Sequence, residues 1–258
     1  MNGRRAITGL CMLCALIVGA FAAQGASAAG TTAYTCAASA PGGFSDAHCK
    51  TQSEGGGFVH KAINNNLTTE LSGSNETTDG IKDSTKLKFT FAGVAVTLTA
   101  TTNTVSGWMT NAEEGGEMLA HGEGTATKTG VTSSAAGCKV FTDTLPGKGE
   151  EGVVHTETIK GTTKGQGDAV KFEPAGAFFA RFIVEGCTNA NLNGTFSVSG
   201  SVKSTTVNGA TVNFTHEDTT AQNTLKVNST IKAGIEGTLT LKSRAKSADS
   251  YVALSATT

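Results

Sequence analysis

Residues 86–99 read Lys-Leu-Lys-Phe-Thr-Phe-Ala-Gly-Val-Ala-Val-Thr-Leu-Thr, and this stretch decides the fold class. An apolar side chain stands at every second position on both sides of Ala92-Gly93. A period of two predicts a β-strand with one buried face, and the glycine between two such runs predicts a turn. We therefore expect an antiparallel hairpin whose buried face carries Leu87, Phe89, Phe91, Val94, Val96 and Leu98.

The same alternation continues through the C-terminal part of the chain. It is carried by Phe196, Val198, Val202, Leu225, Val227, Ile231, Ile235, Leu239 and Leu241. Asn208-Gly209 is the strongest short hairpin signal, because both residues tolerate the positive φ of a type I′ turn. Strand candidates recur roughly every eight to twelve residues, which is typical of sandwiches and barrels. We expect an all-β fold, an antiparallel β-sandwich, with a β-barrel or jelly roll as alternatives.

Three segments depart from this regular pattern. Residues 30–83 are rich in Gly, Ser and Asn, so we expect short strands and long loops there, as a looser N-terminal lobe of a single domain spanning 30–258. Residues 111–124 are acidic and glycine-rich, which predicts a surface loop with one short strand. Residues 169–185 are apolar on both faces, which predicts a central strand pair.

The composition limits the possible functions. The 258 residues carry a formal net charge of −1, and 16% of them are charged. A nucleic-acid binder that is recruited by bulk positive charge is excluded on this ground. Hydrophobic residues make up 38%, but Gly and hydroxyl residues rather than charges take the remaining share, so disorder driven by charge repulsion is not expected.

The N-terminus has the features of an export signal. Arg4-Arg5 is followed by an apolar run over 6–23 and by the small residues Ala26-Ser27-Ala28-Ala29. This order is typical of a secretory signal peptide. We expect residues 1–29 to be removed; a retained membrane anchor is the alternative. The mature chain then has no transmembrane segment and is secreted or held in the cell envelope.

Four cysteines remain after the expected cleavage, and an even number in an oxidising compartment favours two disulfides. We expect Cys36 to pair with Cys49, because they are close in sequence and enclose the turn formers Pro41-Gly42-Gly43. Cys138 then pairs with Cys187. A zinc site would need close Cys or His pairs, and the sequence has no C-x-x-C. We assign no metal and no cofactor.

The stretch from Tyr34-Thr35-Cys36 to Gly43-Phe44-Ser45-Asp46-Ala47-His48-Cys49 resembles a short two-cysteine module of exported β-rich proteins of actinobacteria. In that module an aromatic residue and an Asp precede the second Cys. The family carries no assigned activity, so the resemblance implies an exported β-rich protein and no functional residue.

Possible catalytic or metal-binding patterns are weak. His121 with Glu123, and His155 with Glu157, could meet on one face of a strand, but solvated surface pairs explain them as well. His216-Glu217-Asp218 lacks the second His of a zinc-hydrolase helix. The acidic cluster Glu113, Glu114 and Glu117 could hold Ca²⁺, although an exposed loop is the simpler interpretation. We assign no catalytic residue.

Trp108, the only Trp, is a possible ligand contact if it offers a stacking platform, and otherwise a core anchor, which is the position we expect. The leading hypothesis is a non-enzymatic exported structural or interaction protein, whose partner is an envelope protein or a glycan. A carbohydrate-binding or adhesive module is the first alternative, and it predicts that Trp108, Tyr34 or Tyr251 is exposed. A secreted hydrolase is the second alternative, and it predicts a His and a carboxylate converging in a pocket.

Overall fold

The computed structural model describes residues 31–47, 49, 51–63, 69–74, 84–144, 147–163, 169–208, 211–243 and 250–256. This part of the chain is antiparallel β-structure throughout, apart from turns, loops and the short 3-10 helix η1 (Ala190–Leu192). None of its helices is long and apolar enough to cross a membrane. The expected signal peptide, residues 1–29, lies outside the described residues.

The hairpin predicted from residues 86–99 is confirmed. Strand β4 (Thr85–Phe91) pairs with β5 (Val94–Ala100), and Leu87 lies opposite Leu98. Both turn residues have positive φ, 48° at Ala92 and 75° at Gly93. This is the backbone of a type I′ turn, whose twist matches that of the two strands.

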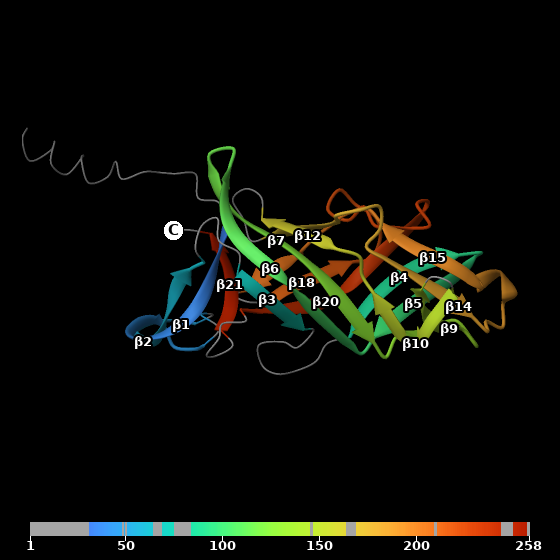
Figure 1. The fold of residues 1–258 in the computed structure, drawn as a ribbon, viewed down its shortest axis with the longest axis horizontal. Coiled ribbons are helices and arrows are strands. Elements are labelled where there is room, and N and C mark those ends of the chain that lie inside the picture. Colours follow the sequence, from blue (N-terminus) through green and yellow to red (C-terminus); the bar gives the residue numbers. More distant parts are fainter. Residues whose placement is uncertain are drawn as a thin grey trace, which may run out of the picture.

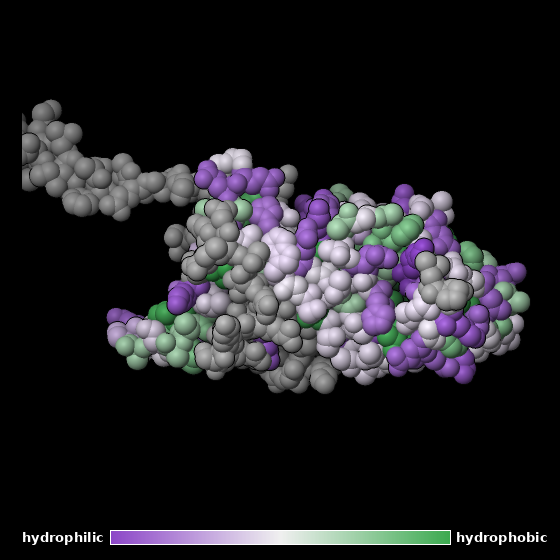
Figure 2. Space-filling view, viewed as in Figure 1, coloured by the Kyte–Doolittle hydropathy of each residue, from purple (hydrophilic) through white to green (hydrophobic). Residues whose placement is uncertain are grey.

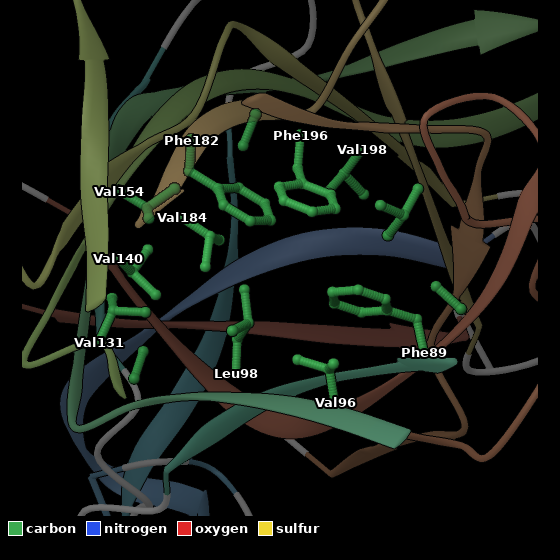
Figure 3. Packing of buried hydrophobic residues seen from close by; sticks show 14 of the residues in the cluster. Phe89, Val96, Leu98, Val131, Val140, Val154, Phe182, Val184, Phe196 and Val198 are labelled. Carbon is green, nitrogen blue, oxygen red and sulfur yellow. The ribbon is translucent and has the colours of Figure 1, made fainter. Parts of the chain in front are cut away.

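This hairpin forms one layer of the predicted sandwich. It extends to β8 (Thr132–Ser133) and faces a second layer with the strand order β10 (Gly147–Glu151), β9 (Lys139–Thr144), β14 (Ala180–Glu185), β15 (Gly194–Ser199) and β19 (Lys226–Val227). Figure 3 shows Phe182 and Phe196 pointing from the second layer towards Phe89, Val96 and Leu98 of the first. The rings of Phe182 and Phe196 are stacked, with centroids 5.7 Å apart.

Both predicted disulfides are confirmed. Cys138 and Cys187 are joined beside the paired strands β9 and β14, and Cys36 of β1 (Thr31–Phe44) is joined to Cys49. Cys36, Cys49 and Cys187 are buried. The bridge between Cys36 and Cys49 therefore holds the chain that follows β1 against this strand, and the bridge between Cys138 and Cys187 joins the segment before β9 to the segment after β14.

In the middle of the molecule a sheet curls round so far that its last strand, by pairing order, pairs again with its first. Around this ring, as we call it, the strands are β18 (Thr211–His216), β20 (Ile231–Ser243), β3 (Thr69–Ser74), β6 (Thr102–Glu114), β7 (Glu117–Thr129), β12 (Ile159–Thr163), β13 (Val170–Pro174), β16 (Val202–Lys203) and β17 (Thr206–Asn208). The short strand β11 (Val153–His155) also pairs with β7.

The segment 202–208 closes the ring. Its first part, β16, pairs with β13, and its last part, β17, pairs with β18. Between them the N–H of Ser204 donates to the carbonyl of Val170, and the N–H of Thr205 donates to the carbonyl of Asn213. The backbone hydrogen bonds of β13 and β18 are thus connected through one short stretch of chain, and the alternative of a sheet closed on itself describes this region.

Strand β20 connects the parts of the molecule. One of its edges pairs with β18 and β21 (Ser250–Ala256), and the other pairs with β4 and β3. Strand β21 continues into a terminal sheet with β1 and β2 (Gln52–Ala62). Figure 1 shows this terminal sheet at one end of the molecule, the ring in the middle and the sandwich at the other end.

Three sequence expectations are wrong. Residues 111–124 are not a loop but lie largely in β6 and β7, thirteen residues each, joined at Gly115-Gly116 with positive φ at both. Residues 169–185 supply two strands, but β13 belongs to the ring and β14 to the sandwich, so they are not a pair. The region 30–83 holds long strands, because β1 has 14 residues and β2 has 11.

The predicted hairpin at Asn208-Gly209 is confirmed in its pairing. Asn208 lies opposite Thr211, so Asn208 is the last strand residue rather than a turn residue. Residues 209–210 lie outside the described residues.

Candidate functional site

Strand β7, which forms a wall of the ring together with β6 and β12, carries very small residues at its inward positions. On β7 every second residue from 120 to 126 is Gly or Ala, and Ala120 and Ala126 are buried. Opposite this row are Gly107 and Met109 on β6 and Gly161 on β12. Closed sheets of about eight strands are either filled by their inward side chains or hold one small ligand, and here the inward side chains are too small to fill the space.

Gly107 and Gly124 lie opposite each other on β6 and β7, at a close approach of the two backbones. A Cβ on Gly107 would lie 2.1 Å from the carbonyl oxygen of Glu123, and one on Gly124 would lie 2.7 Å from the carbonyl oxygen of Ser106. No side chain fits at such distances. Glycine at both positions lets the two strands curl tightly, as at the corners of closed sheets.

A cavity of about 230 Å³ occupies the interior of the ring and reaches the sandwich core. Its lining is mainly apolar and comes from both regions. The large apolar side chains that border it include Leu98, Met109, Phe172, Phe179, Phe214 and Leu239. Phe172 and Phe214 meet edge to face, with centroids 5.4 Å apart, across the closing segment.

The apolar lining offers a large contact area to a bound molecule. Apolar surface that lies against other apolar atoms gains both hydrophobic burial and dispersion contacts. A ligand that fills the space would therefore stabilise the folded protein.

Lys128 is the charged residue that ends the inward row of β7. It lies opposite Asn103 on β6 and Val154 on β11, and it borders the cavity. Burial alone lowers the pKa of Lys128 to about 8. No acidic group among the described residues opposes this shift. The cavity also contains the buried hydroxyl oxygen of Thr85, which has no hydrogen-bond partner among the described residues.

The outer surface differs from this interior. On the face that Figure 2 shows, the hydrophobic residues of the described chain lie in small separate patches among hydrophilic ones. Several lysines of the described surface have acidic partners; Lys88, for example, contacts Glu236 at 2.9 Å and Glu217 at 3.0 Å. The hydrogen bonds that the Lys88 ammonium donates to these two carboxylates raise the pKa of Lys88. The pKa of Glu236 is lowered by its bonds to Lys86 and Lys88.

Trp108 lies on the outer side of the ring wall. The alternation along β6 directs its side chain away from the buried Met109, and Trp108 is half-buried and belongs to neither hydrophobic cluster. The expectation of a core anchor is therefore wrong. Its backbone pairs with Glu123 on β7, and the residue borders the cavity wall. A ligand contact at Trp108 stays a prediction.

Neither of the two candidate His–carboxylate pairs is found among the contacts of the described residues. His121 contacts Glu114 at 3.5 Å near the tip of the β6–β7 hairpin, and Glu123 contacts Lys160 at 3.8 Å. The ring of His155 shares a hydrogen bond of 3.1 Å with the Thr127 hydroxyl, at an exposed position. Among the described residues, no His borders the cavity.

The remaining candidate residues, His216 and the acidic cluster, lie apart from the cavity. His216 is buried, and its Nε2 lies 2.7 Å from the carbonyl oxygen of Lys203 in the closing segment. Glu113 and Glu114 are exposed beside the Gly115-Gly116 turn. The described residues contain no group of three or more His, Cys, Asp or Glu that could hold a metal ion.

The terminal sheet contains a stack of three rings that the sequence pattern does not predict. The ring of His60 on β2 stacks on Tyr34 and Phe44 of β1, with centroids 5.1 and 4.3 Å away. Burial lowers the pKa of His60, and a backbone hydrogen bond at Cys49 opposes this in part. Tyr34 is thus packed rather than presented on a flat exposed face. The side chain of Tyr251 lies outside the description.

No protein-family model, curated protein or solved structure matches this chain. The cavity and Lys128 are therefore the features from which a function can be inferred. The sequence does carry a signal for them, because Ala120, Gly122, Gly124 and Ala126 precede Lys128 at a strict period of two. This signal is missed when only large apolar residues are counted as inward positions.

Proposed function

We propose that this protein is a non-enzymatic binding protein that holds a small apolar molecule inside the ring. The observation that carries the proposal is the row of Gly and Ala on the inner wall, which leaves about 230 Å³ of apolar space in a region that side chains normally fill. A space larger than the roughly 150 Å³ cavity that binds benzene accommodates an acyl chain or a small polycyclic compound.

The place of action that we propose is outside the cytoplasm, in the cell envelope or the extracellular space. Two disulfides are compatible with an oxidising compartment, and the sequence has the order of a signal peptide. An apolar compound needs a carrier in such an aqueous compartment. This role specifies the leading hypothesis of an interaction protein by naming a small molecule as the partner.

The direct test is titration of the purified mature protein with N-phenyl-1-naphthylamine, an uncharged dye that fluoresces in apolar surroundings. We expect saturable binding of one dye per chain and a rise in melting temperature. Organic extraction of the purified protein, followed by mass spectrometry, tests for a ligand that is carried through purification. A fluorescence increase that is linear in dye, together with an unchanged melting temperature, would refute the proposal.

A glycan-binding surface is the second candidate, and the position of Trp108 favours it. A half-buried Trp on the outer face of a strand, outside the hydrophobic clusters, can stack on a sugar ring. Quenching of Trp108 fluorescence by acrylamide, with and without polysaccharide, tests this candidate. Emission that is blue-shifted and not quenchable would remove its best residue.

A further inference from the structure

Lys128 gives the cavity a polar end. The inward row of β7 consists of four Ala or Gly residues, and it ends at Lys128, whose long side chain carries an amine. The neighbours of Lys128 across the two strand pairings, Asn103 and Val154, carry no charge. The space is thus apolar along its length and positive at Lys128.

We propose that the ligand is an amphipathic monocarboxylate, whose apolar chain fills the cavity and whose carboxylate binds the ammonium group of Lys128. This proposal rests on the proposed function, because it names the chemical class of the molecule that the cavity takes. It goes further by assigning a ligand-binding role to one residue.

The first argument is the absence of a protein partner. No described residue forms a hydrogen bond or an ion pair with the Nζ atom of Lys128. The lysines of strand β4 differ, since Lys86 and Lys88 each contact Glu236 at 2.9 Å. Lys128 is half-buried and borders the apolar cavity, so the partial desolvation of its ammonium group is recovered when an opposite charge binds there.

The second argument is the charge state. With a pKa of about 8, lowered by burial, Lys128 still carries its proton in most molecules at pH 7. The apolar cavity therefore has a cation at its border. A carboxylate would neutralise it through a charge-assisted hydrogen bond, which is about twice as strong as a neutral one.

The third argument limits the head group. A single ammonium balances the single charge of a carboxylate. A phosphate monoester carries between one and two negative charges at pH 7 and would bring uncompensated charge into the apolar space. The described lining offers no second unpaired cation, since Lys86 is bound to Glu236. A monocarboxylate with a flexible chain fits both the charge and the shape.

The experiment is displacement of bound N-phenyl-1-naphthylamine at pH 7 by decanoate and by decan-1-ol, which share a chain and differ in the head group. In the wild-type protein we expect decanoate to compete about 10- to 100-fold more strongly than the alcohol. Lys128→Met keeps the volume of the stem and removes the charge, so the two competitors should become equal. The matched control is Lys160→Met, at an exposed lysine on β12, which should keep the preference.

The outcomes separate the two proposals. If the dye does not bind the wild-type protein, the proposed function fails. If the dye binds but decanoate and decan-1-ol displace it equally, the carboxylate role of Lys128 is wrong and the proposed function stands. This comparison uses the wild-type chain alone, so it decides the question even if Lys128→Met does not fold. A preference that persists in a folded Lys128→Met would also overturn the assignment.

Discussion

The side-chain amide of Asn111 on β6 forms hydrogen bonds with both the N–H and the carbonyl group of Ala33 on β1. The N–H of Ala33 donates to Oδ1 of Asn111 at 2.9 Å, and Nδ2 of Asn111 donates back to the carbonyl oxygen of Ala33 at 3.0 Å. The same Nδ2 donates to the carbonyl oxygen of Ile63 at 3.1 Å. Asn111 is 2% exposed and Ala33 is fully buried. One amide thus joins the terminal sheet to the ring.

Replacement of Asn111 by Leu should destabilise the protein by about 2 to 4 kcal/mol. The substitution removes the partner of the buried N–H of Ala33 and the side-chain donor of the carbonyl oxygens of Ala33 and Ile63, although the Ala33 oxygen keeps its bond from the N–H of Ile63. Each buried unsatisfied group costs about 1 to 3 kcal/mol. Chemical denaturation measures the change. The exposed Asn191, whose side chain makes no hydrogen bond among the described contacts, provides the control Asn191→Leu, which should change the free energy of unfolding by less than about 0.5 kcal/mol. Equal effects of the two substitutions would contradict this role of Asn111.

Filling the cavity should abolish dye binding without unfolding the protein. Ala126 is 4% exposed, points inward and borders the cavity. In Ala126→Leu the larger side chain occupies ligand space, so we expect at least a tenfold loss of affinity for N-phenyl-1-naphthylamine and an unchanged or slightly higher free energy of unfolding. The control Ser106→Leu places the same side chain at an exposed position on the outer face of the neighbouring strand β6, away from the cavity lining, and should leave binding intact. Retained binding in a folded Ala126→Leu would show that the dye binds elsewhere.

The two disulfides should contribute unequally to stability. The loop closed by Cys138 and Cys187 spans 49 residues, and the loop closed by Cys36 and Cys49 spans 13. Loop-closure entropy assigns about 4 kcal/mol to the first and about 3 kcal/mol to the second. Thermal and chemical unfolding of the two paired Cys→Ala variants checks the order. Non-reducing peptide mapping that finds free thiols or crossed pairs would contradict the connectivity itself.

The sequence predicts those parts of the fold that large apolar residues build. The alternation around Phe89 and Val96 and around Phe196 and Val198 places both layers of the sandwich, and the cysteine spacing places both bridges. The expectation of a loop over 111–124 is wrong because the inward residues of this part of the ring wall, such as Gly122, contribute almost no hydrophobicity to the pattern. A strand whose inward side chains leave space is recognised in the sequence by small residues at a period of two, not by large hydrophobic ones.

The position of Lys128 could not be inferred for a related reason. On an isolated strand a lysine is expected in solvent, and the charge of its neighbours across β6 and β11 is known only from the pairing register. Similarly, the split of residues 169–185 between ring and sandwich depends on which partners the strands find over long sequence distances. Local periodicity indicates that β13 and β14 exist, but it contains no information on their neighbours.

Lys128 should give the ligand-free protein an unusual alkaline stability profile. Burial lowers its pKa to about 8 in the folded state, whereas an unfolded chain has a lysine pKa near 10.4. Between these values the unfolded state binds more protons than the folded state, so the free energy of unfolding rises with pH. The gain is complete above the unfolded pKa, is absent below about pH 8, and reaches at most about 3 kcal/mol.

Urea denaturation of delipidated wild-type protein and of Lys128→Met, at intervals from pH 7 to pH 10.5, measures this effect as the difference between the two curves. Subtraction is needed because other groups also titrate there; the raised pKa of Lys88, for example, acts with the opposite sign at higher pH. The wild-type protein should gain stability relative to Lys128→Met as the pH rises. A constant difference would mean that the amine of Lys128 is solvated as in the unfolded chain, and the cavity would then lack the buried cation on which carboxylate binding depends.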